Sequence, residues 1–367
     1  MKILIVQSHI GGGGAERVGV LIASGLAQRG HEVYIVTNLH DEVKYPVNEK
    51  VKVLNMVTSP HNKLMKWGSA IKILRRYVKQ VQPDVIIGIM QLSSFIAKLA
   101  TIGKKVPIVM TEHYAFDLAP FREMTLLEKF CKFHLNKIYT HVTVLTEEDK
   151  KVIGDRLHQV SVMPNPLSLR PVDEVLSRGN VILAAGRIDG WHSKGFDVLI
   201  KAWGKLIQNS KLKIHNDGWR LQIAGTGSDT SLAYLKGLCK EYGVEDSVDF
   251  LGFVPDMQSL YQKASIFVLS SRYEGFGLVL IEAMSQGCAC IACDHKGRQR
   301  EIMENESQGL LCPPENIETL SRCMYKMIKD VDYRESVRKN AIERSKFFSI
   351  ENPIERWEKL LNQIVKN

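Results

Sequence analysis

The sequence lacks an apolar run long enough to cross a membrane. Its longest clean apolar stretch covers only residues 85–90 and includes a glycine, whereas a spanning helix needs about 20 apolar residues. The run at residues 2–7 ends in a polar residue, and glycines follow before the apolar core of a signal peptide could form. We therefore expect a protein without an export signal that works in the cytoplasm.

A regular cysteine pattern is also missing. The seven cysteines are odd in number and irregular in spacing, so we expect reduced thiols rather than a disulfide framework. Cys288, Cys290 and Cys293 precede Asp294 and His295, which could suggest a metal site. No second Cys or His pair accompanies them, so we interpret the cysteines as small hydrophobic residues of a buried strand and predict no metal.

The glycines that follow the first predicted strand do not form a dinucleotide fingerprint. In a G-x-G-x-x-G motif starting at residue 11 or 12, the third glycine would fall at Glu16 or Arg17. The second predicted strand ends in Thr37 and Asn38, so no carboxylate is placed for a ribose. The loop is then either a tight turn that needs small residues or a flexible loop near an acceptor or donor phosphates.

Acidic residues are scarce in the first half. Residues 1–172 contain 23 Lys and Arg against 14 Asp and Glu, whereas residues 173–367 contain 26 of each. A basic half indicates an anionic partner such as a membrane surface or nucleic acid. Residues 62–82 hold six basic residues and no acidic one, and their apolar residues recur at spacings of three and four. The basic residues are Lys63, Lys66, Lys72, Arg75, Arg76 and Lys79, and the apolar ones are Leu64, Trp67, Ile71, Leu74, Val78 and Val81.

This segment reads as an amphipathic helix. An ordinary surface helix, packed on the sheet through its apolar stripe, has the same pattern. Because the opposite face has one sign of charge, we expect the helix both to pack in this way and to rest on an anionic membrane surface. A soluble polyanionic acceptor would suit the same charge.

Short apolar runs alternate with helical patterns along the chain, which predicts a mostly parallel α/β sheet. The expected strands are residues 2–7, 32–37, 51–54, 84–89, 108–111, 141–145 and 160–163, then 181–185, 220–224, 248–251, 266–269 and 289–292. Prolines at 164 and 166 begin a predicted linker at 164–179. Two such domains in series would leave a ligand cleft at the carboxyl ends of their strands.

Glu274 and Glu282 carry the strongest functional signal. They flank Gly275-Phe276-Gly277, between a predicted strand and a helix expected to begin near Leu278. The N–H groups of Phe276, Gly277 and Leu278 would then face an anion such as a diphosphate. The two carboxylates would accept hydrogen bonds from sugar hydroxyls. Two glutamates on a solvated surface are the alternative, but apolar residues surround Glu282 in the sequence.

A second cationic element follows the first strand of the second half. Arg187 ends that strand, and Lys194 begins the next helix. The end of the strand and the start of the next helix both face the expected cleft, where an Arg fork and a Lys point charge suit a diphosphate leaving group. Either cation alone would fit an ordinary solvated surface.

Together these motifs resemble the retaining glycosyltransferases of family 4, which have the GT-B fold. The resemblance extends over essentially the whole chain. It includes Gly13 to Arg17, Glu112-His113, Asn165 between prolines, Gly186-Arg187 with Lys194-Gly195, Gly225-Thr226-Gly227, and the glutamates with seven residues between them.

The resemblance implies an α/β protein with two Rossmann-like domains facing across a cleft. Residues 1–170 would form the acceptor-side domain and residues 178–349 the donor-binding domain. The C-terminal helix, 350–367, would cross back to the first domain through Ile354, Trp357, Leu360, Leu361 and Ile364.

The resemblance also implies a role for each site residue. Arg187 and Lys194 would hold the donor diphosphate, Glu282 would bind the nucleotide ribose, and Glu274 would contact the donor sugar. His113 would lie beside the reacting sugar, although a histidine after a strand is often only a hydrogen-bonded core residue. Gly13 and Gly14 would line the cleft. The loop from Asp294 to Glu301 departs from the Gly-Pro loop of many members, so we assign it no sugar contact.

We therefore expect transfer of a hexose-type sugar from a nucleotide diphosphate donor to a glycan or lipid-linked acceptor, with retention of configuration. No metal cofactor and no nucleic-acid partner are expected. Asp330 and Asp332 have the spacing of a metal-binding pair, but we interpret them as a capping turn between two helices. Two rival hypotheses remain: a sugar-nucleotide epimerase of the same architecture and a non-enzymatic two-domain sugar-binding protein.

Overall fold

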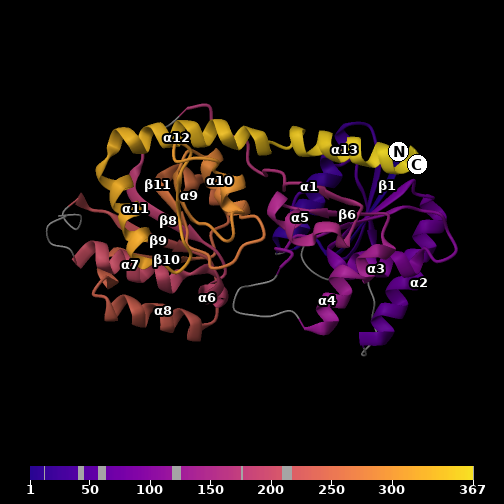
Figure 1. Cartoon of the computed structure of the whole chain (residues 1–367), viewed down its shortest axis with the longest axis horizontal. Helices are drawn as coiled ribbons and strands as arrows, with labels where there is room; N and C mark the ends of the chain where they lie inside the picture. Colours follow the sequence, from indigo (N-terminus) through magenta and orange to yellow (C-terminus); the bar gives the residue numbers. More distant parts are fainter. Residues whose placement is uncertain are drawn as a thin grey trace. The chain divides into compact units, whose positions relative to one another are not determined.

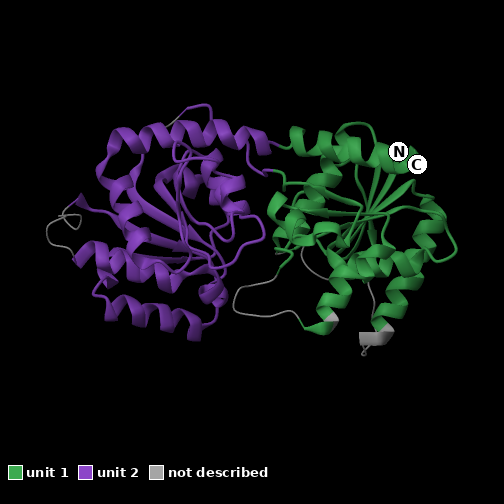
Figure 2. Cartoon of the chain, viewed as in Figure 1, with its two compact units in different colours: residues 1–166, 350–367 green, residues 167–349 purple. Residues whose placement is uncertain are grey.

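The computed structural model describes residues 1–11, 13–39, 45–56, 63–117, 125–174, 177–208 and 217–366. The chain forms two compact units, coloured separately in Figure 2. Unit 1 comprises Met1–Pro166 and Ile350–Asn367, and unit 2 comprises Leu167–Ser349. The first unit thus ends at Pro166 rather than at residue 170, and the second begins at Leu167 rather than at residue 178.

The described part of unit 1 contains a seven-stranded parallel sheet in the order β3-β2-β1-β4-β5-β6-β7 (Figure 1). Its strands are β1 (Lys2–His9), β2 (Glu32–Asn38), β3 (Lys52–Asn55), β4 (Val85–Ile89), β5 (Ile108–Thr111), β6 (His141–Val144) and β7 (Val160–Val162). The central strands are apolar runs because helices cover both faces of the sheet. All five side chains of β4 are buried, for example.

The described part of unit 2 repeats this plan with six parallel strands in the order β10-β9-β8-β11-β12-β13. They are β8 (Gly179–Ala185), β9 (Arg220–Ala224), β10 (Val248–Gly252), β11 (Ala264–Leu269), β12 (Ala289–Cys293) and β13 (Leu310–Cys312). All twelve predicted strands are present, with ends that differ by up to two residues. The sequence prediction missed β13, which is only three residues long.

Most helices of both units lie between successive strands, and the last three follow β13. Those of unit 1 are α1 (Gly14–Gln28), α2 (Lys63–Val81), α3 (Met90–Ala100), α4 (Leu126–Phe133), α5 (Glu147–Ile153) and α13 (Glu351–Lys366). Those of unit 2 are α6 (Trp191–Lys194), α7 (Phe196–Gln208), α8 (Asp229–Glu241), α9 (Met257–Lys263), α10 (Leu278–Ser285), α11 (Ile317–Lys329) and α12 (Val331–Ser345). None of the described helices is both long enough and apolar enough to cross a bilayer.

The C-terminal helix α13 packs on unit 1, as predicted. Ile354 lies against Gly25 of α1, where a Cβ atom on the glycine would come within 2.4 Å of the Ile354 side chain. Glu358 accepts hydrogen bonds from Arg29 at 2.9 Å and pairs with His31 at 2.8 Å. The apolar stripe therefore works as expected, with Ile354, Trp357, Leu360 and Leu361 buried.

The segment predicted as a linker is fastened to unit 2. The Leu167 N–H donates to the carbonyl of Phe348 at 2.7 Å. Arg178 donates to the carbonyl oxygens of Tyr261 and Ala264 at 2.5 and 2.9 Å. Since a guanidinium has five donors, one arginine can bind several strand-end carbonyls. From Leu167 onward, the predicted linker is thus a part of unit 2.

In each sheet, the direction in which successive strands are added reverses at the first strand. β1 lies between β2 and β4, and β8 lies between β9 and β11. Such topological switch points are where open α/β sheets bind ligands, at the carboxyl ends of the strands. Gly13 and Arg187 follow these first strands, whereas His113 follows β5 and Glu274 follows β11 in the same two sheets.

Candidate functional site

In unit 2, the loop after β11 leads into the N-terminus of α10. The helix begins at Leu278, as predicted, and its N-cap is Gly277 in a left-handed conformation, with φ of 98°. A glycine tolerates this conformation without strain. No side chain caps the helix, so its first N–H groups can receive an anion. Phe276 is buried against Phe348, with ring centroids 5.6 Å apart, and this contact anchors the loop.

Lys194 and Glu274 meet in a short ion pair. Lys194 Nζ lies 2.6 Å from Glu274 Oε1, and the Ser271 hydroxyl donates to the same oxygen at 2.8 Å. The stem of Lys194 covers the backbone of Gly186, because a Cβ atom there would lie 3.3 Å from Lys194 Cδ. Arg187 follows directly and is exposed. The structure therefore brings both predicted cations and the first glutamate to the carboxyl ends of the neighbouring strands β8 and β11.

A buried ion pair, which the sequence analysis missed, holds these two loops together. The Arg272 guanidinium donates to both carboxylate oxygens of Asp197 at 2.7 and 2.8 Å and to the His192 carbonyl at 2.6 Å. It also donates to Glu315 at 2.8 Å. The Asp197 hydrogen bonds are the main reason that the pKa of Arg272 is raised. Arg272 stands inside the recognised motif, but nothing in its spacing pointed to Asp197.

Two glycines allow the strand-end loops to approach each other. Gly195 has φ of 64°, and a Cβ atom there would lie 2.0 Å from the carbonyl oxygen of Ser270. A Cβ atom on Gly225 would lie 1.8 Å from the carbonyl oxygen of Gly186. Because both obstacles are backbone atoms, no side-chain adjustment could make room. Glycine at these positions therefore permits the close packing of the loops after β8, β9 and β11.

Glu282 is buried on α10 and already has partners. The Ser168 hydroxyl donates to its Oε1 at 2.9 Å, and the Tyr261 hydroxyl donates to its Oε2 at 3.3 Å. A carboxylate has about four acceptor positions, so it can accept further hydrogen bonds. The alternative of a solvated surface position is excluded for Glu282, which is buried. Ser168 and Tyr261, which the sequence did not indicate, fix the orientation of its carboxylate.

The loop from Asp294 to Glu301 is tightly packed. Gln299 accepts from the His295 N–H at 2.8 Å, and Arg298 is fully buried with Nη1 3.3 Å from His295 Nδ1. Asp294 binds the exposed Arg300 at 3.1 Å. Internal contacts thus occupy several of the polar groups of this loop.

In unit 1, His113 follows β5 and is held in one tautomer. The Thr111 hydroxyl donates its single hydrogen to the Gly88 carbonyl at 3.1 Å. Its oxygen must therefore accept from His113 Nε2, 2.9 Å away, which leaves Nδ1 as an acceptor. Burial lowers the pKa of His113 to about 4, and the Asn165 amide opposes this shift only in part. The ring is neutral near pH 7.

Buried charges support the backbone beside His113. Glu112 accepts from the N–H groups of His113 and Tyr114 at 3.2 and 3.3 Å. Lys132 lies 3.6 Å from Glu112 and donates to the Phe116 carbonyl at 2.8 Å. This network orients the loop, because each buried polar group restricts the position of the next.

The glycine loop of unit 1 differs from a phosphate-binding loop. Gly13 is the N-cap of α1 and Gly14 its first residue, and no side chain caps the helix. The carboxylate of Glu16 folds back against Gly13, where a Cβ atom would lie 1.9 Å from Glu16 Oε2. A negative group next to this helix terminus disfavours a second anion. The predicted contact of Gly13 and Gly14 with donor phosphates therefore has no electrostatic support.

The two motifs that resembled metal sites have structural roles. Cys288, Cys290 and Cys293 are buried in or beside β12, as we interpreted them. Asp330 is the N-cap of α12 and accepts from the Tyr333 N–H at 3.0 Å, which confirms the capping interpretation. Among the described residues, no group of three or more His, Cys, Asp or Glu is arranged to hold a metal ion.

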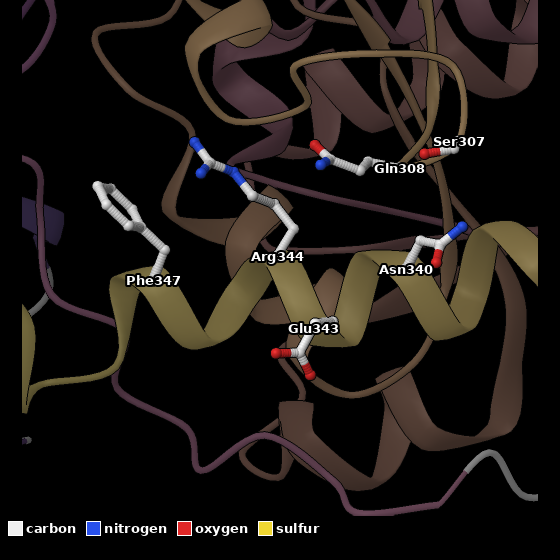
Figure 3. Close-up of a pocket in the computed structure, with 6 residues that line it drawn as sticks. All are labelled: Ser307, Gln308, Asn340, Glu343, Arg344 and Phe347. Atoms are coloured by element: carbon white, nitrogen blue, oxygen red, sulfur yellow. The ribbon is translucent and has the colours of Figure 1, made fainter.

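A shallow pocket in unit 2 lies outside the predicted donor site. It is lined by Ser307, Gln308, Asn340, Glu343, Arg344 and Phe347 (Figure 3). Figure 3 shows Arg344 and Glu343 pointing to opposite sides of α12. Arg344 donates to the carbonyls of Ile302 and Glu301 at 2.9 and 2.7 Å, so its guanidinium has a structural role. None of the predicted donor residues lines this pocket.

Comparisons with known proteins agree with this arrangement. Residues 12–195 match the family described as "Glycosyltransferase Family 4", and residues 170–344 match "Glycosyl transferases group 1". An uncharacterized glycosyltransferase of Haemophilus influenzae is 29% identical over 95% of this chain and 96% of its own length. A Campylobacter jejuni enzyme is 27% identical over 99% of both chains. Its name is GalNAc-alpha-(1->4)-GalNAc-alpha-(1->3)-diNAcBac-PP-undecaprenol alpha-1,4-N-acetyl-D-galactosaminyltransferase.

Solved structures show the same fold. HepE of Anabaena, in complex with UDP and glucose, superposes with a TM-score of 0.80 at 19% identity over 99% of both chains. At this identity the likeness establishes the GT-B architecture alone. The family match extends over half of the chain, and the predicted strand-end motifs lie inside the matched regions. The chain therefore belongs to glycosyltransferase family 4.

Proposed function

We propose that this glycosyltransferase moves a hexose-type sugar from a nucleotide diphosphate donor to a glycan or lipid-linked acceptor, with retention of configuration and without a metal ion. The supporting observation is the Lys194–Glu274 pair at 2.6 Å, next to Arg187 and the uncapped N-terminus of α10. Cations and free N–H groups suit a departing diphosphate, and carboxylates suit sugar hydroxyls.

Each residue then has a defined role in binding and charge stabilisation. Arg187, Lys194 and the N–H groups at Phe276, Gly277 and Leu278 bind the diphosphate as the glycosidic bond stretches. Glu282, oriented by Ser168 and Tyr261, accepts from the nucleotide ribose. In the free enzyme Glu274 neutralises Lys194. When the donor binds, Lys194 turns to the diphosphate and Glu274 accepts from the donor sugar.

His113 acts as a neutral hydrogen-bond acceptor. Its Nε2–H is taken by Thr111, so Nδ1 can accept from a hydroxyl of the reacting sugar.

An incubation with a panel of nucleotide sugars tests this function against its rivals. Release of nucleotide diphosphate supports a transferase. Interconversion of the sugar without release supports an epimerase, and absence of turnover supports a binding protein. The panel should contain UDP- and GDP-linked hexoses and N-acetylhexosamines. Excess chelator in parallel samples tests the metal-free mechanism.

The name of the Campylobacter relative supplies a class of acceptor. That enzyme is named for a substrate linked through PP-undecaprenol. We propose that this chain also uses a lipid-linked glycan, works in the cytoplasm, and reaches its acceptor at an anionic membrane surface through α2. The exposed basic residues of α2 include Lys66, Lys72, Arg76 and Lys79.

Exposed apolar side chains accompany this charge. Trp67 of α2 is 43% exposed, and Leu126 and Phe130 of α4 are 86% and 54% exposed. The helices α3 and α4 connect parallel neighbours of one sheet, so right-handed crossovers place them on the same face. α2 packs against α3 (Figure 1). Basic groups bind anionic headgroups at about 1 kcal/mol each, and apolar groups enter the interface.

Vesicle sedimentation at low salt tests the membrane proposal. The wild-type protein should bind vesicles containing phosphatidylserine and ignore neutral ones. Charge reversal of Lys72, Arg76 and Lys79 should abolish the difference. Arg75 is left unchanged because it donates to the Ile102 carbonyl at 2.9 Å. Trp67 is the most exposed tryptophan of the described chain, so its emission should shift to the blue on binding.

A matched pair of variants distinguishes insertion of α4 into the membrane from nonspecific binding by exposed aromatic side chains. Phe130→Ser should weaken vesicle binding, whereas Phe253→Ser should not, although Phe253 of unit 2 is 69% exposed. Wild-type protein that ignores anionic vesicles would refute the membrane proposal and leave the transferase proposal intact.

A further inference from the structure

Three polar side chains at the carboxyl end of β1 have no role in the donor site. The Ser8 hydroxyl lies 2.9 Å from His9 Nδ1 and donates to Glu16 Oε1 at 3.4 Å. His9 Nε2 lies 3.7 Å from the same carboxylate oxygen. The side chains of His9 and Glu16 are 35% and 15% exposed, so a ligand in solution can reach both.

The charge of this cluster restricts its ligand. The Glu16 carboxylate lies against Gly13, and in the described part of the chain it accepts a hydrogen bond from Ser8, while His9 Nε2 lies 3.7 Å away. An ionised carboxylate only accepts hydrogen bonds and repels phosphate. An imidazole and a hydroxyl can both donate and accept. The cluster therefore suits a neutral ligand that presents several hydroxyl groups.

The position of the cluster relates it to His113. In the sheet, β1 neighbours β4 and β4 neighbours β5, whose carboxyl end carries His113. Two strand spacings correspond to about 10 Å, which is the span of two sugar rings. Between them, the residue after β4, Met90, has a left-handed φ of 69°, a conformation that is costly for a residue other than glycine and clusters at functional sites.

We propose that Glu16, together with His9, binds hydroxyl groups of the acceptor sugar. This inference rests on the proposed function, because it assigns the acceptor end of the same transfer. Glu16 accepts hydrogen bonds from the acceptor, and the Ser8 hydroxyl, which lies 2.9 Å from His9 Nδ1, orients the Glu16 carboxylate by donating to it. Gly13 leaves the space that the carboxylate occupies. The glycine loop of unit 1 is thus the frame of an acceptor site rather than a phosphate loop.

Two variants disturb the carboxylate in different ways. Glu16→Gln keeps its shape and removes its charge. Gly13→Ala keeps the charge but displaces the carboxylate, since the new Cβ atom meets only the mobile end of Glu16. The backbone of Gly13 is extended, with φ of −124°, so alanine is tolerated there. The matched control for Glu16→Gln is Glu32→Gln, at the amino end of β2. The matched control for Gly13→Ala is Gly237→Ala in α8, where the added Cβ atom would have no other atom within 4 Å.

The acceptor probes are p-nitrophenyl glycosides of glucose, galactose, N-acetylglucosamine and N-acetylgalactosamine, with release of nucleotide diphosphate as the readout. Both variants should raise the acceptor KM about 10-fold or more, the scale of one hydrogen bond to a charged group. Acceptor-free hydrolysis of the donor and the Kd of UDP should change less than about twofold. The control variants should match the wild-type protein in every assay.

The split between acceptor and donor readouts decides the proposal. An unchanged acceptor KM in Glu16→Gln overturns it. Tighter UDP binding by Glu16→Gln also overturns it, because that result would place a phosphate beside the carboxylate. An equal loss of hydrolysis and transfer would indicate a merely structural role. Failure of the proposed function is a different result, in which the wild-type protein releases no nucleotide diphosphate from any donor.

Discussion

The two units share one plan of strands but carry different charged side chains after their first strands. The first strand of each sheet, β1 or β8, is followed by a glycine-containing loop at the switch point. In unit 2 this loop presents Arg187 and Lys194, whereas in unit 1 it presents Glu16. Because the backbone plan is the same, side-chain charge must select the ligand. The cations after β8 suit a diphosphate, and the carboxylate of Glu16 after β1 suits sugar hydroxyls.

The largest expected effect concerns the buried pair that supports these cations. Asp197→Ala leaves Arg272 buried without its main partner, so the free energy of unfolding of unit 2 should fall by about 3–5 kcal/mol. Urea denaturation measures this loss. Asp249→Ala is the control, because it removes the more exposed Arg220–Asp249 pair, whose side chains are 43% and 30% exposed, and should cost less than about 1 kcal/mol. Equal losses would contradict a special role for Arg272.

The second-largest expected effect is the loss of turnover when one of the two cations is removed. Arg187→Ala or Lys194→Ala should lower turnover by more than ~100-fold, the scale of one preorganised electrostatic group. Steady-state release of nucleotide diphosphate measures it. Lys236→Ala on the exposed surface of α8 is the control. Near-normal turnover of both variants would show that the diphosphate binds elsewhere.

The neutral histidine of unit 1 predicts a pH dependence of stability. The pKa of His113 is about 4 in the folded chain and about 6.5 in an unfolded one. The unfolded state therefore binds more protons below pH 6.5, so stability falls as the pH drops from 6.5 to 4 and is unaffected above 6.5. His113→Gln should reduce this pH dependence by on the order of 2 kcal/mol. Urea midpoints across this pH range measure it, and an unchanged slope would mean that His113 titrates normally.

The smallest expected effect is that of a chelator. The diphosphate has Arg187, Lys194 and the α10 terminus as counter-charges, and Asp330 caps a helix. Turnover should therefore stay within about twofold of the control in excess EDTA, on the scale of experimental scatter rather than of a lost Lewis acid. Activity lost with chelator and restored by Mg²⁺ or Mn²⁺ would overturn this expectation.

The sequence predicted the strands because parallel strands buried on both faces are continuous apolar runs. It also predicted that Arg187 and Glu274 follow a strand and that Glu282 lies inside the next helix. Lys194 was expected to begin a helix, but it is the last residue of the short helix α6. The sequence could not predict partners that depend on pairing across the sheet, such as Arg272 with Asp197, 75 residues apart. The role of Glu16 could not be predicted either. In the sequence it only occupies the position of the third glycine of a dinucleotide-binding motif, and its contact with Gly13 depends on how its side chain folds back.

The packing of α13 on α1 has a consequence for synthesis of the chain. Arg29 and Glu358 are 329 residues apart, and the whole of unit 2 lies between them. At ribosomal speeds of about 5–20 residues per second, the first unit waits roughly 10–40 s for its last helix. During this time Ile354 is not yet present to cover α1 at Gly25. Nascent chains should therefore depend on a chaperone during that interval.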